Sequence, residues 1–519
     1  MDMSTKKKKQ KWIKLVFGRT GVIIALLILQ IGLLLLYNAW LQEYKAYLTS
    51  IMGLFRFLAV VWVVNDKTEP SFRMTWLVII VAAPVFGVTL YLYVKMQVGT
   101  KALNRRLMNI IRETKHLLRQ DEQVMVDLMQ VSPLTARLGN YMADYAGYPI
   151  YKNTEAKYFP LGEHAFEEMK LQLEKAEKFI FMEFFIVAPG EMWDAILEIL
   201  VRKAQAGVEI RLLYDGTNSF ALLPTDYPKR LEALGISCKI FAPIRPVLST
   251  RQNNRDHRKI LIVDGKVAFT GGINIGDEYI NKKVRFGHWK DNAVMIHGDA
   301  VMSFTLMFLQ MWDITEKHLD VFENYIVSDA GKIPRHSDGY VLPYADSPLD
   351  DERVGEEVYL NTIHTAKRYV HIMTPYLVPA HEMLDSLKHA AKKGLDVKIV
   401  MPRIPDKWYV FLLAKTYYEE LLEAGVQIYE YVPGFVHAKT MVSDDRKAVV
   451  GTINLDYRSL YLHFEDGVYF YRNQIVEQIE EDFQQTLKSC EKVSLVDVRS
   501  LVWYKKLFGR IIRLVAPLM

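Results

Sequence analysis

Residues 254–276 read NRDHRKILIVDGKVAFTGGINIG, and residues 435–456 read FVHAKTMVSDDRKAVVGTINLD, so one pattern occurs twice in the chain. In both stretches a His is followed by a Lys two residues later, by an Asp seven residues later, and afterwards by Gly-x-x-Asn. The residues in these positions are His257, Lys259, Asp264 and Asn274 in the first copy and His437, Lys439, Asp444 and Asn454 in the second.

The repeated pattern supplies groups that suit phosphate diester chemistry. If each copy begins as a β-strand, the His and the Lys two residues later project from the same face. Two copies then give one site two imidazoles and two ammonium groups. The lysines would neutralise the phosphate oxygens while one imidazole attacks phosphorus and the other protonates the leaving alkoxide. We expect Asn274 and Asn454 to contact the same oxygens.

The two aspartates of the pattern stand in a different setting. Residues 263–266 (VDGK) and 443–446 (SDDR) are typical of hairpin turns, which places Asp264 and Asp444 at the strand ends. At that position an aspartate is some distance from the His and Lys head groups. We therefore expect these two motif members to brace the turn or a neighbouring backbone group.

The repeat extends beyond the motif. A short apolar strand, a helix ended by Gly and a second strand occur over residues 179–214 and again over 369–401, in each case ahead of the motif. This order indicates an internal duplication, with an α/β fold and a mixed sheet in each half. A stretch rich in Asp, Ser, Pro and Gly over residues 327–352 separates the halves, and the site is expected at their seam.

The composition limits the chemistry. The chain has 519 residues, half of them hydrophobic, and a net charge of +5. Its two cysteines are far apart and form no CxxC pattern, and no HExxH motif occurs. We therefore expect no disulfide framework, no metal and no cofactor.

The first 95 residues have the composition of a membrane anchor. Uncharged runs near residues 20–42 and 74–94 are each long enough to cross a bilayer as a helix. A segment at 46–64 is interrupted by Arg56 and is either interfacial or a third span. Two spans would put the basic N-terminus and the large domain on the same, cytoplasmic side.

The remaining chain is expected to contain four parts. Residues 96–130 form an amphipathic connector whose apolar stripe packs on the domain or lies on the bilayer, residues 131–335 and 336–495 form the two halves, and 496–519 form a basic amphipathic segment. The terminal segment is either an interfacial helix or a packed terminal helix.

The paired motifs resemble those of the phospholipase D superfamily. The flanks NRDHRK and GFVHAKT, the sequence FGHWKD and the sequence HFE in the position of a related NFE make the chain similar to the bacterial cardiolipin synthases. The resemblance covers essentially the whole chain. It implies two phospholipase-D-like α/β halves packed as a pseudo-dimer around one active site, with N-terminal transmembrane helices.

The resemblance also implies roles for individual residues. One histidine forms a phosphatidyl-histidine intermediate and the other acts as acid and base, and family precedent favours His257 as the nucleophile. A carboxylate is expected to orient each imidazole. The acidic residues that follow the motifs pair Asp291 with His257 and Glu465 with His437. Tyr376 and Glu183 are expected to line the entrance for the acyl chains or the headgroup.

The reaction that this implies is cardiolipin synthesis from two phosphatidylglycerol molecules, with release of glycerol. Its partners are phosphatidylglycerol and an anionic bilayer, without nucleic acid, and its location is the bacterial plasma membrane as a multi-pass protein. The alternatives are a membrane-bound phospholipase D that hydrolyses its substrate or takes another phospholipid donor, a nuclease of the superfamily and a scaffold with an inactive site. The sequence leaves the oligomeric state open.

Overall fold

The computed structural model describes residues 25, 28, 30–32, 45–96, 98–218, 222–243, 254–326, 338–350 and 352–518. The chain divides into two compact units. The first comprises Met1–Ala102, Ile244–Asn253 and Ile511–Met519, and the second comprises Leu103–Pro243 and Asn254–Arg510. Most of the expected span near 20–42 lies outside the described residues, as do residues 327–337 and 351 of the separator at 327–352.

The described part of the first unit includes the helices α3 (Lys45–Val64), α4 (Pro70–Ala82) and α5 (Pro84–Met96). The run at 74–94, expected as one straight span, folds into a hairpin of α4 and α5. Pro84 has no N–H and pushes Ala83 out of the helical conformation, which ends α4. The rings of Trp76 and Tyr91, fifteen positions apart, therefore lie 5.3 Å from each other. Among the described residues, no helix combines the length and the apolar character needed to cross a membrane.

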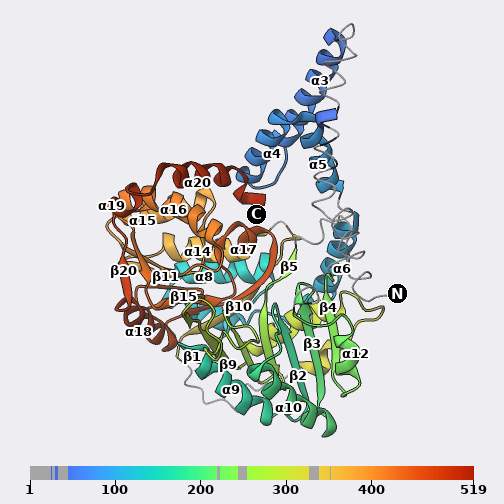
Figure 1. The fold of residues 1–519 in the computed structure, drawn as a ribbon. Coiled ribbons are helices and arrows are strands. Elements are labelled where there is room, and N and C mark those ends of the chain that lie inside the picture. The colour runs from blue at the N-terminus through green and yellow to red at the C-terminus, as the bar shows by residue number, and fades with distance from the viewer. Residues whose placement is uncertain are drawn as a thin grey trace. The chain divides into compact units, whose positions relative to one another are not determined.

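The second unit is built on two mixed sheets with the same strand order (Figure 1). The first sheet runs β1 (Thr154–Phe159), β9 (Ala293–Gly298), β7 (Val267–Gly271), β6 (Lys259–Val263), β2 (Phe179–Phe184), β3 (Glu209–Asp215) and β4 (Ser237–Phe241). The second runs β10 (Tyr340–Asp346), β19 (His463–Tyr471), β17 (Lys447–Gly451), β16 (Thr440–Ser443), β11 (Tyr369–Met373), β13 (Asp396–Pro402), β14 (Gln427–Tyr431) and β20 (Cys490–Lys492). Seven strands match position by position, as the duplicated sequence predicts.

Helices join the two sheets through one shared core. α13 (Val301–Asp313) ends the first half and also contacts β10, while α18 (Ile475–Leu487) ends the second half and also contacts β1. α13 is apolar around most of its circumference and almost entirely buried, as expected for a helix with protein on all sides. The same core contains residues from both sheets, so the halves fold as one body.

The other helices cover the sheets or connect to them. Leu103, Leu107 and Ile110 of α6 (Val98–Thr114) are buried in the shared core, so the connector packs on the domain rather than facing lipid along this stripe. The α-helices that the structure describes in the rest of the second unit are α7 (Glu122–Val131), α8 (Pro133–Tyr141), α9 (Gly162–Glu174), α10 (Glu191–Gln205), α12 (Tyr227–Glu232), α14 (Val354–His364), α15 (His381–Lys392), α16 (Trp408–Glu423), α17 (Tyr457–Tyr461) and α19 (Leu495–Arg499), followed by α20 (Trp503–Val515), which continues into the first unit.

Candidate active site

Two short parallel ladders join the halves at the motif histidines. β5 (Arg255–Asp256) pairs with the start of β19, and β15 (Gly434–Val436) pairs with β8 (His288–Lys290). The backbone N–H of His257 then donates to the carbonyl of Phe464 at 2.9 Å, and that of His437 donates to the carbonyl of Lys290 at 2.7 Å. Each histidine is thus held beside a strand of the opposite half.

These crossed ladders decide which carboxylate serves which histidine. His257 Nδ1 lies 2.8 and 2.9 Å from the two carboxylate oxygens of Glu465, and His437 Nδ1 lies 2.7 Å from Asp291 Oδ2. The expected pairing of Asp291 with His257 and of Glu465 with His437 is therefore wrong. The ladders align Asp256 with Phe464 and Val436 with Lys290, which brings the next residues of the two halves together.

Both carboxylates are fully buried and held by further donors. The hydroxyl of Thr452 donates to Glu465, and the Trp289 indole N–H and the Asn292 backbone N–H donate to Asp291. The neighbouring imidazoles hold the pKa values of Glu465 and Asp291 below their usual range despite burial. Both acids are therefore ionised and can accept the Nδ1 proton of their histidine.

Burial keeps the two imidazoles neutral. It lowers the pKa of His257 to about 3 and that of His437 to about 4, with Glu465 and Asp291 opposing part of the shift. A neutral imidazole that donates Nδ1–H to a carboxylate has its lone pair on Nε2. Each histidine is thus prepared either to attack phosphorus or to take up a proton.

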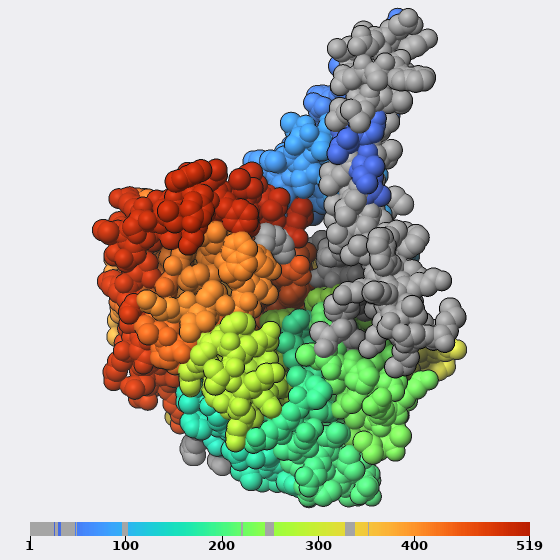
Figure 2. Space-filling model, in the orientation of Figure 1, coloured from blue at the N-terminus to red at the C-terminus, as the bar shows by residue number. Residues whose placement is uncertain are grey.

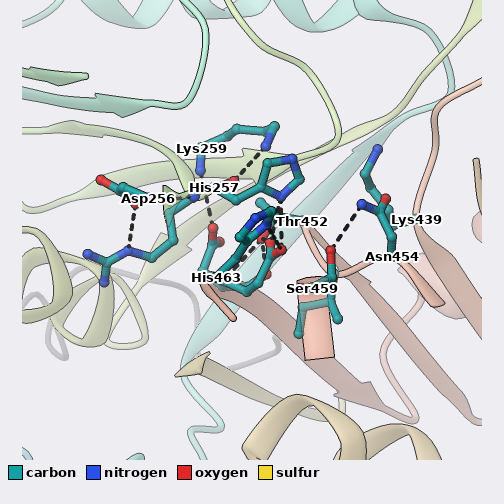
Figure 3. A network of polar contacts seen from close by, with 12 residues as sticks. Asp256, His257, Lys259, Lys439, Thr452, Asn454, Ser459 and His463 are labelled. Carbon is teal, nitrogen blue, oxygen red and sulfur yellow. Dashed lines mark hydrogen bonds and ion pairs between the residues drawn. The ribbon is translucent and has the colours of Figure 1, made fainter. Parts of the chain in front are cut away.

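The two motif lysines are buried in the same region and come from different halves (Figure 3). Lys259 Nζ donates to the carbonyl of His257 at 2.5 Å, and Lys439 Nζ donates to the carbonyl of His437. Burial lowers the pKa of Lys259 to about 8 and that of Lys439 to about 7. Each ammonium has two further N–H groups for an anion, and an anion would restore its charged form.

The motif asparagines also have protein partners. Asn274 accepts a hydrogen bond from the Ile186 N–H and donates to the Tyr279 hydroxyl, both at 2.9 Å, and Asn454 donates to the Ser459 hydroxyl at 3.0 Å. An amide nitrogen has two N–H groups. One N–H of each amide is therefore left without a hydrogen bond to the described residues, and it is this group that a phosphate oxygen could reach.

The motif aspartates brace the backbone, as their turn positions suggested. Asp264 accepts hydrogen bonds from the N–H groups of Glu177, Lys178 and Phe179 at 2.7 to 2.9 Å. Asp444 accepts three in the same way, from Lys367, Arg368 and Tyr369. Each aspartate has positive φ, so the turn itself depends on this anchoring.

The two residues expected at an entrance differ in their positions. Glu183 is fully buried and forms an ion pair with Arg258 at 2.6 Å, so its assignment to an entrance is wrong. A carboxylate beside a motif arginine is accommodated in the interior because it is paired. Tyr376 lies closer to the surface, where it lines a small cavity with Phe435, whose ring stacks on His437.

His463 is a site residue that the motif analysis did not single out. Its ring lies 5.4 Å from that of His257, its Nδ1 is 3.6 Å from Glu465, and neither of its ring nitrogens has a hydrogen bond to the described residues. The signal in the sequence was its position two residues before Glu465, since alternate residues of a strand share a face.

The same three side chains form the one group of metal-ligating type found among the described residues. Ligand atoms of His257, His463 and Glu465 all lie within 4.8 Å of one another. Two of them already form the His257–Glu465 pair. A cation at this point would compete with that pair and would also lie in the field of the buried lysines.

Comparisons with known proteins agree with this geometry. The family model described as "Cardiolipin synthase, PLD-like domain" matches residues 169–312 and 359–487. An uncharacterized protein of Streptococcus mutans is 49% identical over 89% of this chain and 99% of its own length. A cardiolipin synthase of Halalkalibacterium halodurans is 32% identical over 97% of this chain and its whole length.

A solved structure shares the fold. The phosphatidylserine synthase of Haemophilus influenzae superposes with a TM-score of 0.57 at 14% identity, over 75% of this chain and 98% of its own. Three observations support the same family assignment. The two sheets share one topology, the histidine–carboxylate pairs cross between the halves, and the family model matches both halves. The chain belongs to the cardiolipin synthase family, whose catalytic domains are of the phospholipase D type.

Proposed function

We propose that this protein is a cardiolipin synthase that transfers the phosphatidyl group of one phosphatidylglycerol to the headgroup hydroxyl of another. The observation that carries the proposal is the pair of buried neutral imidazoles, each backed by an ionised carboxylate of the opposite half. Two histidines that can each act as nucleophile or base, together with two lysines, suit the exchange of one alkoxide for another at a phosphate diester.

In the first step, Nε2 of His257 attacks phosphorus. As the N–P bond forms, the imidazole becomes cationic, and the carboxylate of Glu465 at Nδ1 stabilises that charge. The bond from phosphorus to the glycerol oxygen breaks, and His437 donates a proton to that oxygen. The phosphate anion raises the pKa of His437 toward neutrality when it binds, so a protonated His437 is available only in the complex.

In the second step, the headgroup hydroxyl of another phosphatidylglycerol replaces the glycerol. His437 takes the hydroxyl proton, the new O–P bond forms, and the N–P bond to His257 breaks. Lys259 and Lys439, with Asn274 and Asn454, neutralise the equatorial oxygens in both steps. The number of phosphate diester bonds is unchanged, so the reaction is reversible.

The proposal includes a membrane location, in the bacterial plasma membrane with the second unit in the cytoplasm. α3 supports it, because Phe55, Phe57 and Trp62 are each at least half exposed along a helix with few charges. The uncharged run expected near 20–42 would anchor the chain. A bilayer then holds donor and acceptor near one active site formed by both halves, which favours a lipid alcohol over water.

The direct test is to incubate the purified protein in detergent with phosphatidylglycerol alone. Cardiolipin and free glycerol in equal amounts are expected. Phosphatidic acid as the main product would identify a hydrolase instead, and activity only after addition of another phospholipid would identify a different donor.

A second test concerns the covalent step. His257→Ala and His437→Ala are each expected to abolish product while the protein stays in the membrane fraction. When the His437→Asn variant is mixed with phosphatidylglycerol, mass spectrometry of its peptides should locate the phosphatidyl adduct on His257. An adduct on His437 in His257→Asn instead would reverse the two roles.

A further inference from the structure

Residues 503–510 of α20 belong to the second unit and lie along α16 on its surface (Figure 2). Arg499, at the end of α19 just before α20, forms ion pairs with Glu419 and Glu423 at the end of α16. Further along, Phe508 stacks on Trp408 at the beginning of α16, with 5.7 Å between ring centroids. α20 therefore runs antiparallel to α16, toward the end of α16 where Trp408 lies.

The outer side of this helix pair is apolar. Trp503 is 73% exposed, Leu507 is 51% exposed and Trp408 is 65% exposed, and Tyr504 and Phe508 lie beside them. Residues 503 and 507 are one helical turn apart, so they form a continuous stripe. A contiguous group of large apolar side chains facing outward marks an interaction site more often than an isolated one does.

Basic side chains border this stripe. Helical spacing places Lys506 and Arg510 along one edge and Lys505 along the other, and Lys505 and Arg510 are exposed. An exposed apolar stripe with aromatic residues and cationic borders is the pattern of a helix that lies in the headgroup region of an anionic bilayer. A protein partner matched to the same stripe would need acidic groups on both of its edges.

The stripe continues toward the active site. Trp408 follows Lys407, whose Nζ is 3.4 Å from the hydroxyl of Tyr376. Tyr376 and Phe435 line one small cavity, and Phe435 stacks on the ring of His437 at 5.9 Å. A lipid lying against α16 would therefore have its headgroup near the catalytic histidines.

We propose that this docking surface rests in the headgroup layer of an anionic membrane and sets the active site at the depth of the substrate phosphates. It consists of Trp408, Trp503, Tyr504, Leu507 and Phe508 with Lys505, Lys506 and Arg510. The inference rests on the proposed function. It identifies the surface through which the second unit would contact the lipid substrates of cardiolipin synthesis.

The test uses the full chain with Cys238 and Cys490 replaced by Ala and one new cysteine carrying an environment-sensitive fluorophore. In Leu507→Cys, addition of phosphatidylglycerol vesicles is expected to shift the emission to the blue, and lipids with spin-labelled acyl chains should quench it at least twofold. The matched control is Leu171→Cys on α9, which is 57% exposed, and it should do neither. An unshifted Leu507 probe overturns the proposal. A shift without lipid quenching, together with disulfide-linked dimers of the unlabelled Leu507→Cys chain, also overturns it and assigns the surface to a second copy of the chain.

A kinetic test separates this proposal from the reaction itself. For each variant, the rate on phosphatidylglycerol vesicles is divided by the rate on dispersed short-chain phosphatidylglycerol. Leu507→Asp should lower this ratio about tenfold, whereas Leu171→Asp should leave it unchanged. Equal ratios in the two variants contradict the docking surface. Absence of cardiolipin from short-chain substrate in the unmodified chain would instead contradict the proposed function, and the fluorescence result would still stand.

Discussion

Glu465→Gln tests the crossed pairing most directly. The substitution keeps the shape of the side chain and removes a fully buried charge that lies 2.8 and 2.9 Å from His257 Nδ1. When His257 carries the phosphatidyl group, its positive charge is about 4 Å from that carboxylate. At an effective dielectric of about 20 such a pair is worth about 4 kcal/mol.

In Glu465→Gln, the amide side chain retains part of this stabilisation of the His257 cation. Its amide oxygen can still accept the Nδ1–H hydrogen bond, which contributes about 1 kcal/mol. The net loss of about 3 kcal/mol corresponds to a rate about 150-fold lower. Because the charge develops as the N–P bond forms, the burst of glycerol in a rapid-quench experiment should slow by this factor.

A matched control is present in the same chain. His371 is buried, and its Nδ1 lies 3.0 Å from both oxygens of Glu480, in a histidine–glutamate pair that includes neither motif histidine. Glu480→Gln should leave the glycerol burst within about twofold of the unmodified rate. If folded Glu465→Gln retains more than a fifth of the unmodified rate, or if both variants lose activity equally, Glu465 does not act on the nucleophile.

Three further predictions concern stability, pH and metals. Asp264→Asn should lower the melting temperature by several degrees, because a neutral side chain replaces an anion that accepts three backbone hydrogen bonds, a loss of about 1.5–3 kcal/mol; an unchanged melting curve would contradict the bracing role. Burial lowers the pKa of His257 from 6.5 to about 3, so between these values the unfolded chain binds the extra proton and the folded state loses stability as the pH falls. From pH 7 to pH 5 the unmodified chain should thus lose about 2 kcal/mol more than His257→Asn in denaturant unfolding, and equal losses would refute a neutral buried His257. Dialysis against EDTA should leave cardiolipin formation unchanged, since Lys259 and Lys439 supply the positive charge, and loss of activity restored by a divalent cation would show otherwise.

Much of the site could be predicted because the relevant rules are local. The i, i+2 spacing of His257 and Lys259 predicted one strand for both, whereas the structure places Lys259 at the start of β6 and His257 just before it. The turn sequence around Asp264 correctly separated that aspartate from the motif histidine and lysine. The duplication made the same arguments apply to the second copy. These predictions depend on neighbours within a few residues, which a sequence displays.

The errors arose where contacts join distant segments. Asp291 follows His257 by 34 residues, but a three-residue ladder between β8 and β15 places it beside His437. Pairing this short has almost no composition signal. Glu183 was misplaced for the same reason, since its partner Arg258 lies 75 residues further on, between β5 and β6. At the N-terminal unit, the hydropathy of residues 74–94 concealed the effect of Pro84 on helix direction.

The crossed ladders have a consequence for the order in which the protein becomes competent. His257, the proposed nucleophile, precedes Glu465 by 208 residues, so during synthesis it emerges without the carboxylate that orients it. A first half that has already folded is therefore chemically idle, and it cannot transfer phosphatidyl groups to water or to a wrong alcohol. Activity begins only when the second half has docked, which makes completed assembly a precondition of catalysis. Half-chains produced separately should remain inactive alone and regain activity only if they associate.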